Sequence, residues 1–388
     1  MEINNSNYIF FVGQRDDRDN FKIVYKFETP IAGIENNRIS NLENFFDTVK
    51  KNIYAIEQKL SHTFKEIVLI LENFNPKFIS LSGYKRLNGS QILRENITYI
   101  LNTLKSCVEE IETKKTVLHI FNSEFKLDNK VTKNLPIGLF GDFYSHELSF
   151  ALINTNDHKN LNYIFDKINL KISKILIKSF VKGANISDNN KKTDTFFHIK
   201  INENDSKIFY FENNSLKFEQ GFKFGTDIII KDISKITSVK IDIVKIILKK
   251  IVSLENVLEN ELIEESYFND NAYRKIKKKL IYDIIFTRIK EISEIILFKN
   301  INLMYFNKFS NNIFLEIDHN IQFKCLNEIY KKIFSIDGSR NINFVKPSDE
   351  STLNTANKLV HFGWKKEAIP TSKSKKSFIV RLFDAIFG

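Results

Sequence analysis

The residues most able to do chemistry are two histidines, His119 and His146, which fall in two predicted strands of one small region. Imidazole nitrogens bind metal ions and transfer protons, so the pair suggests two hypotheses, a metal site or an acid–base pair. No third ligand accompanies them. Asp128 and Asp142 stand beside asparagine or glycine in turn-like segments, as turn residues do. We therefore expect structural histidines and turn aspartates, with no catalytic residue and no metal site.

Cysteine and serine motifs add no active site. Cys107 and Cys325 are isolated thiols, which fits a reducing compartment, and neither C-x-x-C nor H-E-x-x-H occurs. No Ser-His-Asp order accompanies a nucleophile-elbow motif. Residues 1–7 lack the basic and apolar regions of a signal peptide, and no apolar stretch reaches the ~18 residues of a membrane span. We expect neither a secreted nor a membrane-spanning protein.

Glycine is scarce, and its spacing excludes the common phosphate-binding loops. The chain of 388 residues has 12 glycines and 5 prolines. No two glycines are adjacent, and none begins a G-x-G-x-x-G or a G-x-x-x-x-G-K-[ST]. A dinucleotide fingerprint and a Walker A loop are therefore both excluded.

The positive charge is concentrated in two short segments. Of the net charge of +11, residues 271–290 carry +6 and residues 365–388 carry +4. A general nucleic-acid binder more often spreads its basic residues over a face of the whole fold, so we expect no nucleic-acid partner. Local clusters favour two acidic partners, and solvated helix faces are the alternative.

The C-terminal segment combines this charge with an apolar repeat. After a linker at 365–377, large apolar residues recur every four positions in two adjacent rows, so a helix over 378–388 has one broad apolar face. Such a helix fits the interface of an anionic membrane, and docking back on the protein is the alternative. The membrane-binding candidates are Lys375, Lys376, Phe378, Ile379, Arg381, Leu382, Phe383, Ile386 and Phe387.

Hydrophobic periodicity predicts alternating strands and helices in both halves of the chain. In the first half, strands are predicted at 7–13, 21–27, 67–71, 78–81, 117–121, 146–153 and 171–177, and helices at 42–60, 95–111 and 157–168. The polar run 187–194 is the clearest linker. In the second half, strands are predicted at 195–201, 206–211, 216–223 and 313–317, and helices at 226–235, 239–251, 272–299, 322–334 and 351–361. This duplicated layout predicts an α/β fold of two lobes that face a cleft.

Five strings, in order along the chain, resemble the bacterial cell-division family FtsA. PIGLFGDFYSHEL at 136–148 resembles its P-[VI]-G-L-x-G segment, and HIFNSEFKLDN at 119–129 resembles the strand just upstream. LSGYKRLNGSQI at 81–92, FKFGTDIIIKDIS at 222–234 and ANKLVHFGWKKE at 356–367 resemble three further segments of that family.

The resemblance implies an actin-like, RNase H-like α/β fold of two lobes, with an inserted FtsA-type α+β subdomain and a C-terminal amphipathic helix. The implied division is residues 1–77 and 158–190 for the first lobe, 78–157 for the inserted subdomain, 191–364 for the second lobe with a helical partner-binding subdomain at 235–300, 365–377 for a linker and 378–388 for the membrane-targeting helix.

The residues at the nucleotide pocket implied by the resemblance depart from the family's phosphate-binding motifs. Residues 7–13 align with the family's second strand, which implies that the first strand and its phosphate turn are absent. K-I-N-E-N-D at 200–205 replaces the second phosphate turn, D-I-G-G-G-T, and its acidic residues would repel phosphate. The degenerate pocket is marked by Asn202, Glu203, Asp205, Gly225, Asp232, Glu316 and Asp318. We therefore expect no cofactor and no ATP turnover, although the family alone would imply ATP and magnesium.

Three basic residues are candidates for binding a partner. Arg274, Lys278 and Arg288 are spaced by 4 and 10 residues, which on one helix brings them within about 40° of a common face. Arg288 aligns with an arginine of the family helix that meets the C-terminal tail of FtsZ, the tubulin-like division protein. Such tails carry carboxylates, which arginine binds bidentately.

The resemblance implies a division scaffold that polymerises at the division site, on the cytoplasmic side of the cell membrane. It would tether FtsZ there and help to recruit the division machinery. Three alternatives stay open: an actin-like ATPase with an altered pocket, a nucleic-acid-binding protein, and an ATP-binding actin-like protein of a pilus or secretion assembly.

Overall fold

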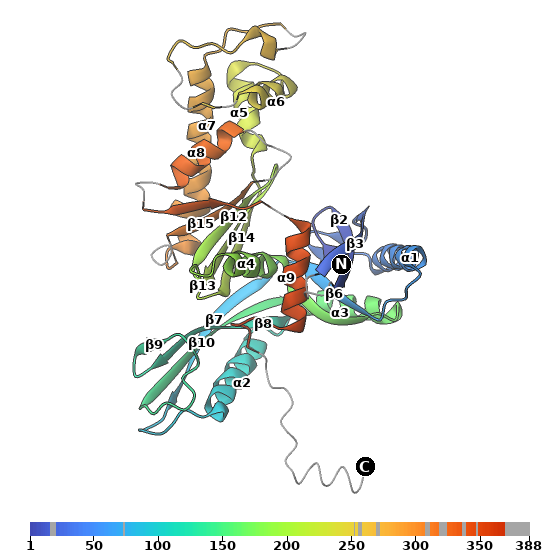
Figure 1. Ribbon diagram of the computed structural model, residues 1–388, viewed down its shortest axis with the longest axis vertical. Coiled ribbons are helices and arrows are strands. Elements are labelled where there is room, and N and C mark those ends of the chain that lie inside the picture. The colour runs from blue at the N-terminus through green and yellow to red at the C-terminus, as the bar shows by residue number, and fades with distance from the viewer. Residues whose placement is uncertain are drawn as a thin grey trace. The chain divides into compact units, whose positions relative to one another are not determined.

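The computed structural model forms two compact units (Figure 1). It describes residues 1–15, 21–72, 74–251, 253–254, 258–268, 272–306, 311–317, 324–335, 339–346 and 348–368. Unit 1 comprises Met1–Asn185, Asn213–Lys217 and Thr352–Gly388, and unit 2 comprises Ile186–Glu212 and Phe218–Ser351.

A five-stranded sheet forms the centre of unit 1. Its strand order is β11-β6-β1-β2-β3, with bounds Lys171–Ile177, Glu66–Leu71, Glu2–Ile3, Asn7–Arg15 and Phe21–Pro30. The central strand, β1, runs antiparallel to β2 and parallel to β6. A two-stranded ribbon, β4 (Ile34–Glu35) with β5 (Arg38–Ile39), precedes the first helix.

Two amphipathic helices share one apolar core with this sheet, α1 (Leu42–Leu60) and α3 (Thr155–Lys167). The side chain of Asn41 caps α1 by accepting from the Asn44 N–H at 2.9 Å. The predicted apolar stripe of α1 is confirmed, because its buried residues recur at helical spacing: Phe45, Val49, Ile53 and Ile56.

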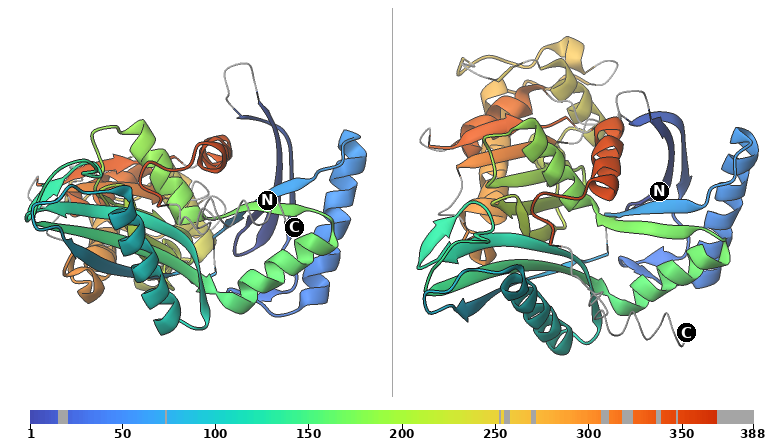
Figure 2. Two further views of the ribbon diagram at one scale, coloured as in Figure 1. Left: turned by 90° about the horizontal axis from the view of Figure 1, so that it is seen from below. Right: turned by 60° about the horizontal axis from the view of Figure 1, so that its bottom comes forward.

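A second sheet of unit 1 is antiparallel and lies between β6 and α3 in the chain. Its order is β7-β10-β8-β9, with bounds Lys77–Arg86, Phe143–Asn154, Lys115–Leu127 and Lys130–Thr132. Helix α2 (Arg94–Ile111) packs across one face (Figure 2). A Cβ on Gly83 of β7 would lie 2.6 Å from Ile100 Cγ2, so glycine at this position allows the close approach of α2.

A second five-stranded sheet, which lies in unit 2 except for residues 215–217 of β14, repeats the strand order of the first sheet. It runs β14-β13-β12-β15-β16, with bounds Ser215–Phe222, Ser206–Glu212, Phe196–Ile201, Asn312–Ile317 and Asn341–Phe344. Its central strand, β12, runs antiparallel to β13 and parallel to β15. The predicted duplication of the α/β layout is therefore confirmed at the level of strand order.

The described helices of unit 2 share one large apolar core with its sheet. They are α5 (Asp227–Thr237), α6 (Ile241–Lys250), α7 (Lys278–Ser293), α8 (Lys324–Phe334), the π-helix Glu294–Phe298 and two 3-10 turns, Glu265–Tyr267 and Ile301–Leu303. Two further helices are α4 (Lys178–Asn189), which starts in unit 1, and α9 (Asp349–His361), which belongs to unit 1 from Thr352 onward. None of the helices in the described ranges is long and apolar enough to cross a membrane.

Four sequence expectations are corrected by the structure. The first strand is present as β1, and two residues are too few for periodicity to reveal. The run predicted as a linker at 187–194 begins inside α4. The helix predicted from residue 272 starts only at Lys278. Residues 352–364, assigned to the second lobe, group with unit 1.

Candidate functional site

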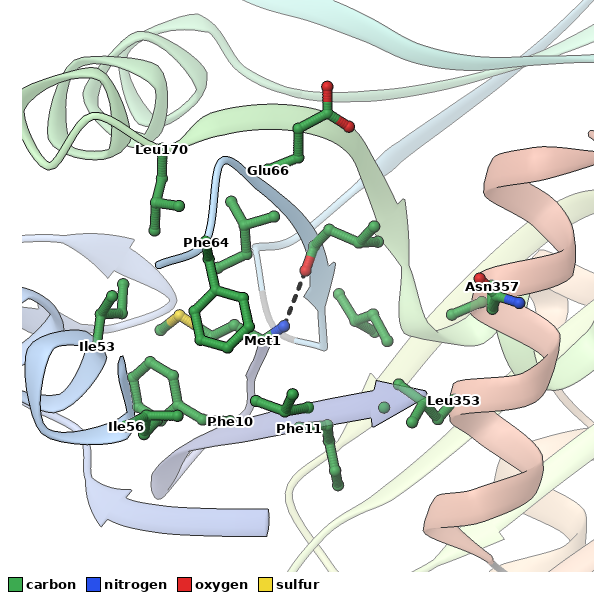
Figure 3. Close-up of a pocket in the computed structure, with 16 residues that line it drawn as sticks. Met1, Phe10, Phe11, Ile53, Ile56, Phe64, Glu66, Leu170, Leu353 and Asn357 are labelled. Carbon is green, nitrogen blue, oxygen red and sulfur yellow. Dashed lines mark hydrogen bonds between the residues drawn. The ribbon is translucent and has the colours of Figure 1, made fainter. Parts of the chain in front are cut away.

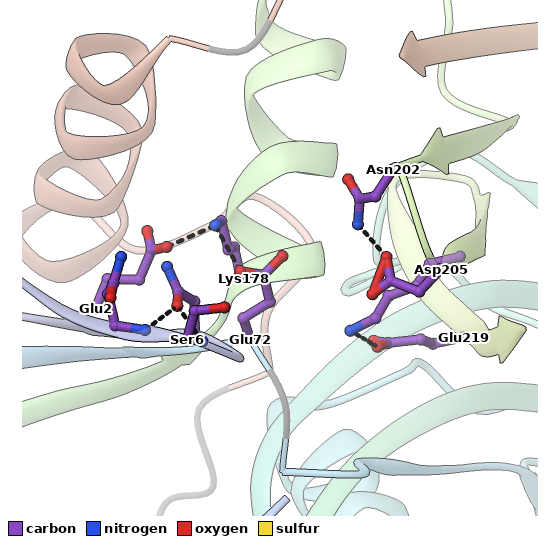
Figure 4. A network of polar contacts seen from close by, with 10 residues as sticks. Glu2, Ser6, Glu72, Lys178, Asn202, Asp205 and Glu219 are labelled. Carbon is purple, nitrogen blue, oxygen red and sulfur yellow. Dashed lines mark hydrogen bonds and ion pairs between the residues drawn. The ribbon is translucent and has the colours of Figure 1, made fainter. Parts of the chain in front are cut away.

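The parallel strands of unit 1 end at a cluster of buried charges. Glu2 lies on β1, Glu72 directly follows β6, and Lys178 directly follows β11. Lys178 Nζ lies 2.6 Å from Glu2 Oε1 and 2.8 Å from Glu72 Oε2, and the three side chains are at most 14% exposed (Figure 4). We call this cluster the Lys178 triad.

Two opposing effects act on the pKa of Lys178. Burial disfavours the charged ammonium, but the carboxylates of Glu72 and Glu2 outweigh it and raise the pKa above its ordinary value. Open α/β sheets bind ligands at the carboxyl ends of their strands. At that edge of unit 1, a polyphosphate would meet one buried cation and two buried carboxylates.

Sequence reasoning did not single out the Lys178 triad. Its members are separated by 70 and 106 residues, so no local motif joins them. One signal was available, because a lysine directly after the apolar strand Lys171–Ile177 stands at a strand's carboxyl end.

The turn after β1 is closed by a side chain. Asn4 Oδ1 accepts from the backbone N–H groups of Ser6 at 2.9 Å and Asn7 at 2.7 Å. The Asn4 N–H donates to the Asn7 carbonyl at 3.2 Å. Backbone amides in such turns are the groups that cradle phosphate in nucleotide-binding loops. Here one asparagine side chain occupies two of them.

The corresponding turn of unit 2, residues 202–205 between β12 and β13, is closed by backbone contacts. The Asn202 N–H donates to the Asp205 carbonyl at 2.9 Å, and the Asn202 side-chain amide donates to the Asp205 carboxylate (Figure 4). The carbonyls of Asn202 and Glu203 in turn accept from the N–H groups of Thr226 and Asp227, each at 3.0 Å. The amides at the start of α5 are therefore directed at the turn.

Gly225 makes this contact possible. A Cβ there would lie 2.2 Å from the Asn202 carbonyl oxygen and 2.5 Å from that of Glu203. Only glycine lets the two backbones approach this closely. The structure therefore brings together four predicted pocket residues: Asn202, Glu203, Asp205 and Gly225.

Of the other predicted pocket residues, Asp232 and Glu316 contact residues outside the turn at 202–205. Asp232 Oδ2 accepts from Arg288 Nε of α7 at 2.5 Å. Glu316 is buried on β15, 3.1 Å from His198 Nε2. Asp318 lies outside the described residues.

The three predicted partner-binding residues do not share a helical face. Arg274 precedes α7 and donates to the Thr237 carbonyl at 3.1 Å, so the expectation of a common face is wrong for this residue. Lys278 Nζ lies 2.6 Å from Glu261 Oε1. The start of α7 after Lys277, whose backbone is extended, explains the difference.

Arg288 lines a cavity of about 350 Å³ between α5 and α7. Three acidic residues share its wall, Asp232, Asp283 and Glu291, together with the half-exposed Ile236. Arg288 bonds Asp232 through Nε and Glu291 through Nη1. These contacts use two of its five N–H groups and hold the guanidinium in place.

The two predicted structural histidines are buried in the antiparallel sheet. His119 Nδ1 donates to Glu367 Oε1 and His146 Nε2 donates to Asn122 Oδ1, both at 2.9 Å. Burial, aided by the positive charge of Lys366, lowers the pKa of His146 to about 4. Within the described part of the chain, no group of three or more His, Cys, Asp and Glu side chains could hold a metal ion.

The two aspartates lie in the turns around this sheet. Asp128 has φ +49°, and its carboxylate accepts from the N–H groups of Asp142 and Phe143, each at 2.8 Å. It is therefore a turn residue, as predicted.

The C-terminal segment is bound to unit 1 up to Ala368. The Ala368 N–H donates to the Ile120 carbonyl at 2.7 Å, and Glu367 Oε2 lies 2.7 Å from Lys174 Nζ. His119 and Lys174 together help to lower the pKa of Glu367 against the opposing effect of burial. The predicted membrane-binding residues, Lys375 to Phe387, lie outside the described residues.

No protein-family model matches the chain. It is similar to cell division protein FtsA of Buchnera aphidicola from Acyrthosiphon pisum, with 21% identity, covering 100% of this chain and 94% of that protein. It is also similar to cell division protein FtsA of Neisseria meningitidis serogroup B, with 18% identity over 76% of this chain and 72% of that protein.

A solved structure with a similar fold covers nearly the full length of this chain. It is a PilM-PilN type IV pilus biogenesis complex, with a TM-score of 0.53, 9% identity and coverage of 93% of this chain and 95% of the matched chain. Sequence and fold comparisons thus both extend over most of the chain at low identity.

Proposed function

We propose that this chain, an FtsA-type member of the actin-like ATPase superfamily, is a membrane-associated scaffold of cell division that tethers FtsZ without ATP turnover. The carrying observation is the match to an FtsA protein over 100% of this chain and 94% of that protein. The actin-like fold, the duplicated sheets and the inserted antiparallel sheet support the same assignment.

The proposal that the protein works without nucleotide is supported by the residues at the carboxyl edge of the sheet in each unit. In unit 1 the Lys178 triad fills the carboxyl edge, and in unit 2 the turn at 202–205 is held against Gly225. Acidic side chains stand at both edges, where an ATP site needs amides and cations. Neither ATP nor magnesium is part of the proposed function.

The remaining roles follow from the family and the chain's charges. The apolar and basic residues between Lys375 and Phe387 are proposed to hold the protein on anionic lipid at the inner face of the cell membrane. Self-association into polymers at the division site belongs to the same proposal. Arg288 is proposed to bind a carboxylate of the FtsZ tail through its remaining guanidinium N–H groups, against the repulsion of the acidic residues Asp232, Asp283 and Glu291 in the cavity wall.

The test is binding of a synthetic FtsZ tail peptide to the full chain. Arg288→Glu should weaken binding at least ten-fold, because a charge-assisted contact contributes about 1.5–3 kcal/mol. Lys290→Glu is the matched control, since it makes the same charge change on the same helix at an exposed position. If Arg288→Glu and the wild type bind the peptide with equal affinity, the FtsZ tail does not contact Arg288.

The similarity in fold to the PilM-PilN complex favours a second candidate function, that of an actin-like protein in a pilus assembly. Co-sedimentation separates the two. The scaffold should carry the FtsZ tail peptide onto anionic vesicles, and a chain truncated after Glu367 should leave the peptide in solution. A full chain that binds neither vesicles nor peptide would favour the pilus assembly.

A further inference from the structure

Large apolar side chains of unit 1 occur in two settings. One set lines a cavity of about 230 Å³ beside β1, where Phe10, Ile53 and Ile56 belong to the core of the five-stranded sheet (Figure 3). The other set lies at the surface, on loops at one end of the antiparallel sheet. Four of its side chains are 43–71% exposed, and we call them the apolar tip: Leu93, Ile137, Leu139 and Phe140.

The antiparallel sheet brings the two loops that carry the apolar tip to the same end. Residues 87–93 follow β7, and residues 133–142 precede β10. The last residue of β7, Arg86, pairs with the first residue of β10, Phe143. The two loops are therefore neighbours in space although they are distant in the chain.

Backbone hydrogen bonds join these loops into a short ribbon. The Ile92 N–H donates to the Leu139 carbonyl at 2.8 Å, and the Gly138 N–H donates to the Ile92 carbonyl at 2.9 Å. An antiparallel bridge also pairs Gln91 with Phe140. The four side chains of the apolar tip therefore stand on neighbouring stretches of backbone.

A tight turn fixes the most apolar part of the ribbon. The Leu139 N–H donates to the Pro136 carbonyl at 3.2 Å, and Gly138 has φ +87°. The third residue of such a turn needs a positive φ, which glycine adopts without strain. The exposure of Ile137 and Leu139 is thus a property of an ordered turn. Large apolar side chains that are grouped and exposed mark an interaction surface.

Cations accompany the apolar tip. Residues 84–95 and 126–143 contain six lysines and arginines and three acidic residues, which gives a net charge of +3. Four of these cations are exposed, and none of the four forms an ion pair with another described residue: Arg86, Arg94, Lys130 and Lys133. The surface therefore combines apolar side chains with cations that are available to an anionic partner.

We propose that the apolar tip inserts into the interface of an anionic membrane, with the four exposed cations at the lipid phosphates. A lipid interface accepts apolar side chains without a complementary pocket, and its negative charge attracts lysine and arginine. The proposal rests on the membrane location proposed above. It goes beyond the tail anchor, because a second, folded contact orients unit 1 on the bilayer.

The apolar tip and the C-terminal tail can reach one membrane surface. The Ala368 N–H donates to the Ile120 carbonyl of β8. From Ile120 to Leu127, at the end of the sheet that carries the tip, β8 rises about 23 Å. Residues 369–377 can span about 30 Å when extended. The tail helix expected at 378–388 can therefore lie level with the tip.

A fluorescent label measures the depth of the tip in the bilayer. Ile137→Cys is labelled with NBD in the full chain with Cys107→Ser, which removes the exposed native thiol. Cys325 remains, because it is buried and burial raises its pKa to about 12. Val24→Cys, at an exposed position of β3 in the same unit, carries the label in the control. A C-terminal hexahistidine tag and nickel-chelating lipid hold every chain on the vesicles, whether or not the tail binds.

On vesicles rich in phosphatidylglycerol, a quencher on the lipid acyl chains should reduce emission from position 137 about three-fold more than emission from position 24. Phosphatidylcholine in place of phosphatidylglycerol should remove most of this difference. Equal quenching at the two positions would overturn the proposal. So would a blue shift at position 137 that grows with protein concentration in the absence of lipid, since it assigns the tip to a second copy.

Vesicle binding of the untagged, unlabelled chain gives a second readout. Phe140→Ser should weaken binding to the anionic vesicles about five-fold, because it removes an apolar group from the interface. Phe362→Ser is the matched control, since Phe362 is 70% exposed and lies outside the tip. Equal binding of the two variants would contradict the tip contact and leave the tail anchor intact. Quenching at position 137 on the tagged chain, without binding of the untagged chain, would contradict the tail anchor and support the tip.

Discussion

The two five-stranded sheets share one strand order and differ in how the edge beside the central strand is closed. In unit 1 the closure is electrostatic, with Lys178 between Glu2 and Glu72. In unit 2 the closure is steric, with the turn at 202–205 against Gly225. The same position in the two sheets is therefore closed in two different ways, and we expect the two closures to respond differently to substitution.

The largest effect should come from removing the buried cation. Lys178→Met leaves two carboxylates buried without their counter-ion, which should lower the free energy of unfolding by about 3–5 kcal/mol. Lys231→Met is the control in unit 2, because Lys231 is exposed where it pairs with Asp227 and its loss should change stability by less than about 0.5 kcal/mol. Urea unfolding measures both.

A compensated variant sharpens this result. Glu2→Gln and Glu72→Gln added to Lys178→Met remove the stranded charges, so more than half of the lost stability should return. If Lys178→Met alone costs no more than Lys231→Met, the triad does not hold the edge of unit 1.

The steric closure of unit 2 should respond to a single methyl group. Gly225→Ala places a Cβ against two carbonyl oxygens and should cost about 1–3 kcal/mol. Gly221→Ala is the matched control, since a Cβ there meets nothing within 4 Å. Equal thermal unfolding of the two variants would mean that the turn and α5 do not need their close contact.

We expect a smaller effect from His146 of unit 1, which should make the free energy of unfolding depend on pH. The folded pKa of His146 is lowered to about 4, so as pH falls below ~6.5 the unfolded chain takes up the proton first and stability declines. Between pH 7.5 and 5.5 the loss from this group should be about 1 kcal/mol. His146→Gln should show a correspondingly shallower decline in urea unfolding. Parallel curves would show that His146 titrates normally in the folded chain.

Sequence periodicity predicted the elements that are long and one-sided. The stripe of α1 and the strand at Lys171–Ile177 were evident because each buries one face or a continuous run. β1 was missed because two residues carry no period. The start of α7 was placed too early because the lysines before Lys278 suit a helix, whereas the backbone at Lys277 is extended.

The candidate site could be predicted from the sequence only where the structure allows a single residue type. Gly225 stood out because glycines are few, and its close contact with the turn explains its presence. The Lys178 triad joins three distant positions through the fold, which no local pattern encodes. The basic residues were identified, but their acidic partners, such as Asp232 for Arg288, depend on how α5 and α7 pack.

The most direct test of the account is calorimetric titration of the full chain with ATP and magnesium. The same preparation must bind the FtsZ tail peptide, which shows that it is folded and competent. We expect no saturable heat up to millimolar ATP, because acidic side chains stand at both sheet edges and the Asn4 side chain already engages two amides of the turn in unit 1. Saturable binding at micromolar ATP would contradict it.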